Sequence, residues 1–294
     1  MTSITRINSK QFYQNYYGHP INDLHTLYKN LKTINPNKHF IYLAGDSSLD
    51  NKHWLPNNEY HNLSNNYDQF MQPPLGKPDI CYHMNNMYKD YYTINCAVEE
   101  SSIGKRENQL LAQDQFIHDN ITNDDILVVS VGGNDVALSP TLSTIWNMAL
   151  LIYMNSMSTL TDDPLNAYGF SYFINMFRHS VKEYVLKLIG NKRPKKIIIC
   201  MIYYPDMKMT GSWADKTLGY LSYNTDPKKL QKAIEQIFYH ATCKIRIKGT
   251  NVVALPLFHY LNGQDTKDYI QRVEPSSQGG KKMAEAFIGA CLVP

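Results

Sequence analysis

The sequence has little of what marks disulfide-rich, metal-binding or nucleic-acid-binding proteins. Its five cysteines are odd in number and widely spaced, at positions 81, 96, 200, 243 and 291. This spacing argues against a disulfide framework and against a zinc site, and it favours a reducing compartment. The 29 basic and 26 acidic side chains nearly balance, so the charge gives no reason to expect a nucleic acid as partner.

Long hydrophobic runs are missing as well. Residues 1–6 are followed by no apolar run, which argues against a secretory signal. The longest apolar stretch, residues 145–157, is interrupted by Asn147 and Asn155 and is too short to span a bilayer. We therefore expect a cytoplasmic protein without a transmembrane segment, in which this stretch forms a buried or lid-like helix.

Five short runs of Ile, Val, Leu, Cys and Tyr are the main structural signal. They are residues 40–44, 92–98, 126–131, 196–203 and 251–258. Near-continuous apolar runs of this length are typical of strands buried on both faces, as in a parallel sheet. Amphipathic stretches that predict helices are residues 106–120, 172–189, 227–246 and 281–291. The alternation predicts an α/β fold around a parallel five-stranded sheet.

No linker or internal repeat divides the chain, so we expect a single domain over residues 1–294. Two segments, about 49–90 and 141–169, are too long for simple crossovers. We interpret both as insertions, and long excursions in a compact domain are often functional.

Three polar blocks carry the candidate chemistry. In open α/β sheets, ligands bind beyond the carboxyl ends of the strands. Gly-Asp-Ser-Ser, residues 45–48, follows the first run and can expose the Ser47 hydroxyl on a sharp turn. Gly-Gly-Asn-Asp, residues 132–135, follows the third run, and Asn134 offers the amide donor that a developing oxyanion needs. The third block is residues 273–280, Val-Glu-Pro-Ser-Ser-Gln-Gly-Gly. Each block alone also fits an ordinary turn or helix start.

In order and spacing the three blocks resemble those of the SGNH (GDSL-like) hydrolase family, from about residue 40 to residue 286. The resemblance implies a flavodoxin-like three-layer α/β/α sandwich. It also implies ester hydrolysis without a metal or organic cofactor, with Ser47 as nucleophile and Asn134 as oxyanion donor. Their neighbours Asp46, Gly133 and Asp135 are expected to contact the substrate.

Two positions depart from the family pattern. Glu100 stands where the family has a glycine whose N–H joins the oxyanion hole. We expect that N–H still to serve, with the carboxylate pointing away or pairing with a cation such as Arg106. In the last block, Glu274 occupies the position of the family's histidine and Gln271 that of its aspartate. The usual imidazole base is therefore absent from its usual place.

Three substitutes for that base remain open. Glu274 itself can act as base if burial raises its pKa, and we rank it first because it stands at the family's position for the base. His259, at the end of the fifth run, is the second candidate. The third is a histidine from the first insertion, His53 or His83, assisted by a carboxylate from the segment before the last block. The two carboxylates considered for that role are Asp265 and Asp268.

The function that these residues indicate is a serine esterase or acyl hydrolase. Its substrate would be a small-molecule, lipid or carbohydrate ester, and aromatic side chains could line an acyl or sugar pocket. The candidates for such a lining are Trp54, Tyr60, Tyr82 and Trp213. Two alternatives stay open: a non-catalytic binding protein on the same scaffold, and an acyltransferase that uses the same serine.

Overall fold

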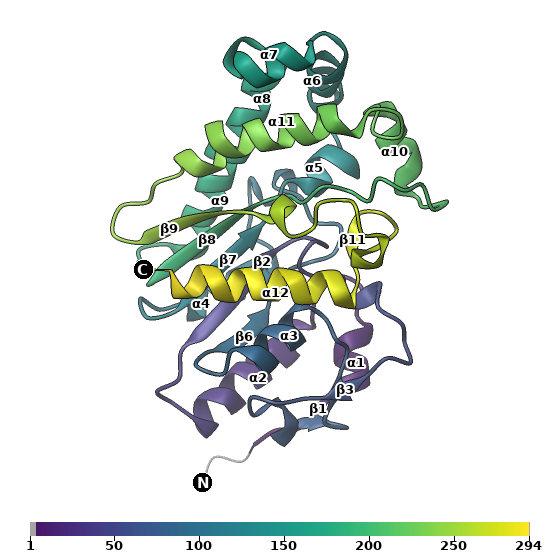
Figure 1. The fold of residues 1–294 in the computed structure, drawn as a ribbon. Coiled ribbons are helices and arrows are strands. Elements are labelled where there is room, and N and C mark those ends of the chain that lie inside the picture. Colours follow the sequence, from purple (N-terminus) through teal and green to yellow (C-terminus); the bar gives the residue numbers. More distant parts are fainter. Residues whose placement is uncertain (1–3, 294) are drawn as a thin grey trace.

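A sheet of five parallel strands forms the centre of the molecule in the computed structural model, which describes residues 4–293 (Figure 1). The strand order is β6-β2-β7-β8-β9. The bounds are β2 (Phe40–Gly45), β6 (Tyr92–Asn95), β7 (Ile126–Ser130), β8 (Lys196–Met201) and β9 (Asn251–Pro256). These are the five predicted runs, and the order is that of flavodoxin-like sheets. The expected α/β class with a five-stranded parallel sheet is confirmed.

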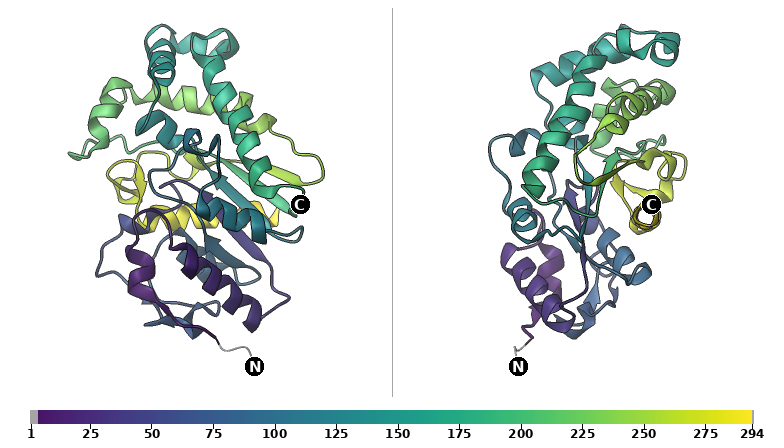
Figure 2. Two further views of the ribbon diagram at one scale, coloured as in Figure 1. Left: turned by 180° about the vertical axis from the view of Figure 1, so that it is seen from behind. Right: turned by 90° about the vertical axis from the view of Figure 1, so that its left-hand side faces the viewer.

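Helices cover both faces of this sheet, which makes three layers (Figure 2). One face packs against α3 (Ile80–Met87) and α12 (Ser277–Leu292). The helices of the other face are α2 (Ile21–Ile34), α4 (Ala112–Asn120), α9 (Val181–Ile189) and α11 (Pro227–His240). Because successive side chains of a strand point to opposite faces, both faces of each strand must be apolar. This is why the strands appear in the sequence as continuous apolar runs.

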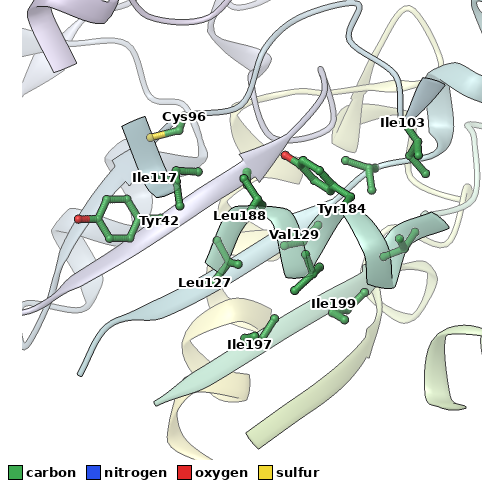
Figure 3. Packing of buried hydrophobic residues seen from close by; sticks show 14 of the residues in the cluster. Tyr42, Cys96, Ile103, Ile117, Leu127, Val129, Tyr184, Leu188, Ile197 and Ile199 are labelled. Atoms are coloured by element: carbon green, nitrogen blue, oxygen red, sulfur yellow. The ribbon is translucent and has the colours of Figure 1, made fainter. Parts of the chain in front are cut away.

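The core between the sheet and the second helical layer consists of large aliphatic and aromatic side chains. Leu127 and Val129 of β7 lie beside Ile197 and Ile199 of β8, with Leu188 of α9 packed over them (Figure 3). All five are at most 1% exposed.

Several helices differ from the predicted bounds. The predicted helix 172–189 consists of α8 (Phe170–Ile174), a π-helical stretch (Asn175–Ser180) and α9. The predicted helix 106–120 begins only at Ala112, because residues 104–106 form a 3-10 turn that directs Arg106 inward. Two N-terminal helices, α1 (Ser9–Gln14) and α2, were not predicted.

The two predicted insertions differ in character. Residues 49–90 contain short elements and end in α3, which is one of the layer helices. The short elements are η1 (Asn51–His53), β3 (His61–Asn62), η2 (Tyr67–Gln69), β4 (Met71–Gln72) and β5 (Leu75–Gly76), and β4 pairs with β1 (Ile7–Asn8). Residues 141–169 form α6 (Leu142–Tyr153), α7 (Met157–Asp162) and η4 (Pro164–Asn166). Among residues 4–293, none of the helices is both long and apolar enough to cross a membrane.

Candidate active site

Ser47 lies in a tight turn directly after β2, between the ends of β2 and β7. This is where the strand order reverses, the usual ligand position in such sheets. A Cβ atom on Gly45 would lie 2.1 Å from the carbonyl oxygen of Ser130, so the turn requires glycine there. The Asp46 carboxylate accepts the Ser48 N–H at 3.0 Å, and the Asp46 carbonyl accepts those of residues 49 and 50. The turn thus has helical hydrogen bonds of its own, and its residue Ser47 lines a cavity described below.

Asn134 sits in the first turn of the short helix α5 (Gly133–Ala137), after β7. Gly132, the residue before α5, has a φ of 103°, a left-handed conformation that glycine adopts without strain. The Asn134 Nδ2 donates to the carbonyl of Ser101 at 2.9 Å, and the side chain is 8% exposed. A primary amide has two N–H donors, so one remains for a ligand.

The neighbours of Asn134 have different roles. Gly133 lines the same cavity as Ser47 and Asp46. Asp135 does not line that cavity; its carboxylate accepts the N–H groups of Ile103 at 2.8 Å and Gly104 at 3.1 Å. Asp135 therefore holds the segment after β6 in place, a role different from the substrate contact expected of it.

Glu100 adopts a left-handed conformation with a φ of 56°, which is the physical reason why a glycine is expected there. Its carboxylate accepts a hydrogen bond from the Tyr16 hydroxyl at 2.9 Å. The expected pairing with Arg106 is wrong, because the Arg106 Nε donates to Asp114 at 2.8 Å and its Nη2 to the Gly45 carbonyl at 2.9 Å. The Glu100 carboxylate is bound to Tyr16 and does not line the cavity that contains Ser47.

Glu274 stands in a two-residue strand, β11 (Glu274–Pro275), paired with β10 (Tyr269–Ile270). The turn between them contains two left-handed residues, one of which is Arg272 with a φ of 65°. The buried Arg272 guanidinium holds this turn through Asp215 at 2.7 Å and Asn224 at 2.8 Å. On the other side, the Asn51 amide donates to the Pro275 carbonyl at 3.1 Å.

The Glu274 carboxyl lies in the same cavity as Ser47 and Asn134 and is 3% exposed. Burial raises the pKa of Glu274 to about 8; interaction with the Ser47 hydroxyl opposes the rise, and the nearby carboxylates of Asp46 and Asp50 add to it. A general base works best when its pKa is near the working pH. A buried glutamate of this kind meets that condition, whereas an exposed one is too acidic.

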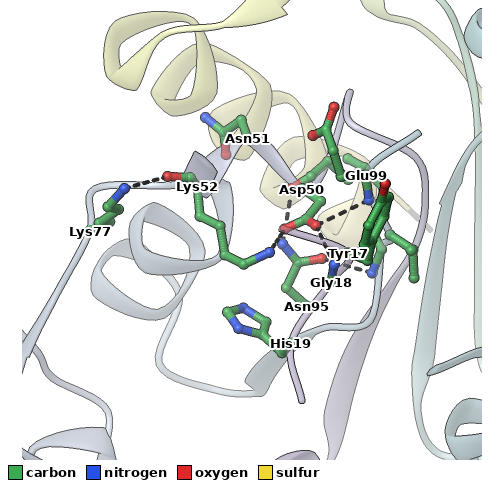
Figure 4. Close-up of polar contacts among 12 residues, drawn as sticks. Tyr17, Gly18, His19, Asp50, Asn51, Lys52, Lys77, Asn95 and Glu99 are labelled. Atoms are coloured by element: carbon green, nitrogen blue, oxygen red, sulfur yellow. Dashed lines mark hydrogen bonds and ion pairs between the residues drawn. The ribbon is translucent and has the colours of Figure 1, made fainter. Parts of the chain in front are cut away.

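Glu99 is a further buried acid that the sequence analysis did not single out. Burial, and next the charge of Glu274, raise the pKa of Glu99 to about 9. Figure 4 shows Glu99 beside Asp50, which accepts the Glu99 N–H at 3.2 Å and pairs with the fully buried Lys52. Asp50 thus has a cation as partner, whereas Glu99 has the charge of Glu274 nearby, which disfavours its own ionisation. In the sequence, the only sign of a special role for Glu99 is that two acidic residues, Glu99 and Glu100, follow each other directly after a strand.

The histidines considered as bases lie elsewhere. His259 is exposed at the end of a 3-10 turn after β9, and His53 packs edge-on against Tyr16 at a ring distance of 4.5 Å. His83 lies 3.3 Å from the Ser277 hydroxyl. The carboxylates of Asp265 and Asp268 contact Gln278 and Lys282. Within residues 4–293, no histidine lines the cavity with Ser47.

That cavity, called here the Ser47 cavity, has a volume of about 120 Å³. Its polar end is formed by Asp46, Ser47, Ser48, Asn134 and Glu274, and its walls are apolar. Of the four aromatic residues predicted as lining, Trp213 lies in the wall, whereas the others do not. No group of three or more His, Cys, Asp or Glu side chains arranged to hold a metal ion occurs in the described part of the chain.

Comparisons with known proteins found similarity only at the level of structure. No family model and no curated protein sequence matches the chain. A lipase from a goat rumen metagenome superposes with a TM-score of 0.49 at 12% identity, covering 86% of this chain and 97% of that one. An extracellular lipase from Streptomyces rimosus superposes with a TM-score of 0.43 at 8% identity, covering 86% of this chain and 99% of that one. An acetylxylan esterase from Geobacillus stearothermophilus superposes with a TM-score of 0.42 at 14% identity, covering 87% of this chain and 95% of that one. At these values, function has to be argued from the site itself.

Proposed function

We propose that this protein is a serine ester hydrolase with Ser47 as its nucleophile. The observation that carries the proposal is that Ser47, Asn134 and Glu274, which come from three distant segments, line one cavity. A hydroxyl nucleophile, an amide donor and a buried base are the three groups that acyl transfer to serine needs. The SGNH-like order of the three sequence blocks supports the same roles.

In the first half of the reaction, the Ser47 Oγ attacks the ester carbonyl carbon while Glu274 accepts the hydroxyl proton. The carbonyl oxygen becomes an oxyanion, which the free Asn134 N–H and the backbone N–H of Ser47 stabilise, since Glu100 does not line the cavity. The tetrahedral intermediate then loses the alcohol, which takes the proton back from Glu274. An acyl group remains on Ser47.

In the second half, water replaces the alcohol. Glu274 takes a proton from the water as it attacks the acyl carbon, and the Ser47 Oγ leaves with that proton. The burial that raises the pKa of Glu274 to about 8 makes it a stronger base than an ordinary carboxylate. This compensates in part for the missing imidazole.

The test is labelling by a fluorophosphonate probe, which reacts with activated serine hydroxyls. Wild-type protein and Ser48→Ala should be labelled, and Ser47→Ala should not. Ser48 is the matched control because it is the adjacent buried serine and its hydroxyl bonds that of Ser130 at 2.7 Å. Equal labelling of wild type and Ser47→Ala would overturn the proposal.

One observation favours a second candidate, a non-catalytic binding protein. A Glu274 with a pKa of about 8 is mostly protonated at neutral pH, and a protonated carboxyl cannot accept the serine proton. On this reading, p-nitrophenyl esters are not hydrolysed above background at pH 7, and hydrolysis does not appear at pH 9 either, where the esterase proposal expects full activity. Measurable hydrolysis that Ser47→Ala abolishes would exclude it.

A further inference from the structure

The Ser47 cavity is polar next to Ser47 and apolar along the rest of its wall. Its polar groups are all at the end next to Ser47, apart from two aromatic side chains with polar atoms. One of these, Tyr203, already donates its hydroxyl to the Val273 carbonyl at 2.6 Å, and the other, Trp213, is 37% exposed. The other wall side chains are apolar, among them Met148, Leu151, Phe173, Phe177, Ile234 and Ile237.

Most of these wall residues come from helices outside the sheet, whereas Met201 ends β8 and Ile202, Pro205 and Val273 lie in loops. Met148, Leu151 and Ile152 belong to α6, and Phe173 and Phe177 to α8 and the π-helical stretch. The opposite wall is α11 together with the short helix α10 (Ala214–Tyr220). Figure 1 shows α6 and α8 above α11, α11 above the strands β8 and β9, and α10 beside the far end of α11. Beside the nucleophile, the cavity is therefore lined by the apolar side chains of several helices.

The chemistry of these walls selects what can fill them. A sugar ring placed there would lose its hydrogen bonds to water and find few partners, which costs free energy for each hydroxyl. A methylene chain gains free energy from the same burial. Residues 136–161, which include all of α6, contain no charged side chain, so a chain between α6 and α11 meets no buried charge from this segment.

We propose that the Ser47 cavity holds the acyl chain of a fatty-acyl ester, so that the substrates are medium- to long-chain acyl esters and not acetylated sugars. This inference rests on the proposed ester hydrolysis at Ser47. Asn134, the proposed donor to the carbonyl oxygen, lies in the first turn of α5, and Val136 and Ala137 of the same helix belong to the wall. The acyl carbons next to the carbonyl therefore meet the apolar wall at once.

The first experiment compares p-nitrophenyl esters of increasing acyl length, from acetate through butyrate and octanoate to decanoate. Complete burial of one methylene is worth about 0.8 kcal/mol, or about fourfold in kcat/KM. We expect kcat/KM to rise about tenfold or more from butyrate to octanoate. A flat or falling series, or a length dependence found only in acetate esters of longer alcohols, would overturn the inference.

A pair of variants on α6 tests the location. Met148→Trp enlarges a side chain of the wall, whereas Ile145→Trp makes the same kind of change at a position that is 48% exposed and outside the wall. The ratio of kcat/KM for octanoate over butyrate should fall about tenfold in Met148→Trp and stay at the wild-type value in Ile145→Trp. Equal ratios in both variants would place the acyl chain elsewhere.

Binding to Ser47→Ala separates this inference from the proposed function. Titration calorimetry with dodecanoate should detect binding to Ser47→Ala, and Met148→Trp in that background should weaken it about tenfold. Binding without any probe labelling of the wild type would sink the esterase proposal alone. Hydrolysis of acetate esters with no chain-length dependence and no dodecanoate binding would sink the acyl-chain inference alone.

Discussion

The side-chain amide of Asn134 donates a hydrogen bond of 2.9 Å to the carbonyl of Ser101. This bond joins the turn after β7 to the turn after β6, across the intervening end of β2. It fixes the rotamer of Asn134, so that its second N–H has a defined direction before any substrate binds. Fixed donors of this kind lower the barrier because they need no reorganisation during the reaction.

Asn134→Ala is expected to lower kcat about 10²–10³-fold, the usual effect of losing one oxyanion donor. KM should change much less, because the donor acts mainly on the charge that develops in the transition state. Steady-state kinetics with a p-nitrophenyl ester measures both constants. A loss confined to KM would show that Asn134 binds the ground state and is not an oxyanion donor.

Glu274→Gln is expected to lower kcat about 10²–10⁴-fold, because the amide keeps the shape of the side chain but cannot accept the serine proton. Glu99→Gln is the matched comparison, since it removes the neighbouring buried carboxyl and leaves Glu274 in place. We expect less than about tenfold loss for Glu99→Gln. The same loss in both variants, or full activity of Glu274→Gln, would contradict the assignment of the base.

The pH dependence of kcat/KM should follow the ionisation of Glu274. The base works in its charged form, and burial raises its pKa to about 8, so activity rises with pH and levels off above about pH 9. An imidazole with the ordinary pKa of about 6.5 would already reach its plateau near pH 7.5. A midpoint close to 6.5 would therefore indicate a histidine base.

The same pKa shift predicts how the stability of the fold depends on pH. The folded-state pKa of Glu274, about 8, lies above its ordinary value of 4.5, so the folded state holds a proton that the unfolded state has lost. The free energy of unfolding therefore falls as pH rises from about 4.5 to 8. Glu274→Gln should be more stable than wild type at pH 9, and urea unfolding should show that this advantage disappears near pH 4.5.

Arg106→Ala should destabilise the fold by about 3–5 kcal/mol, because it leaves the Asp114 carboxylate buried without its cation. Both side chains are fully buried in the structure. Lys105→Ala changes the next residue in the chain, whose exposed ammonium donates to the Glu100 carbonyl at 3.0 Å, and is expected to cost less than about 1 kcal/mol. Urea unfolding measures the free energy of unfolding of both variants. Similar losses of stability in the two would contradict a structural role for the Arg106–Asp114 pair.

The sequence by itself determined the sheet and the position of two site residues. A strand buried on both faces must be apolar throughout, so each of the five apolar runs predicts one strand of the sheet. Ser47 and Asn134 follow directly after strands whose carboxyl ends meet at one edge. The proximity of Ser47 and Asn134 can therefore be predicted from the apolar runs that precede them, and each run is recognised within a short stretch of sequence.

Tertiary structure alone decided the rest. Glu274 faces Ser47 because Arg272 and Asn51 hold its hairpin through partners up to 224 residues away, and no local pattern encodes such contacts. The Glu100 carboxylate bonds Tyr16, 84 residues distant, and not Arg106. The apolar walls likewise exist only once α6 and α11 pack together, because an amphipathic helix shows which face is buried but not what that face encloses.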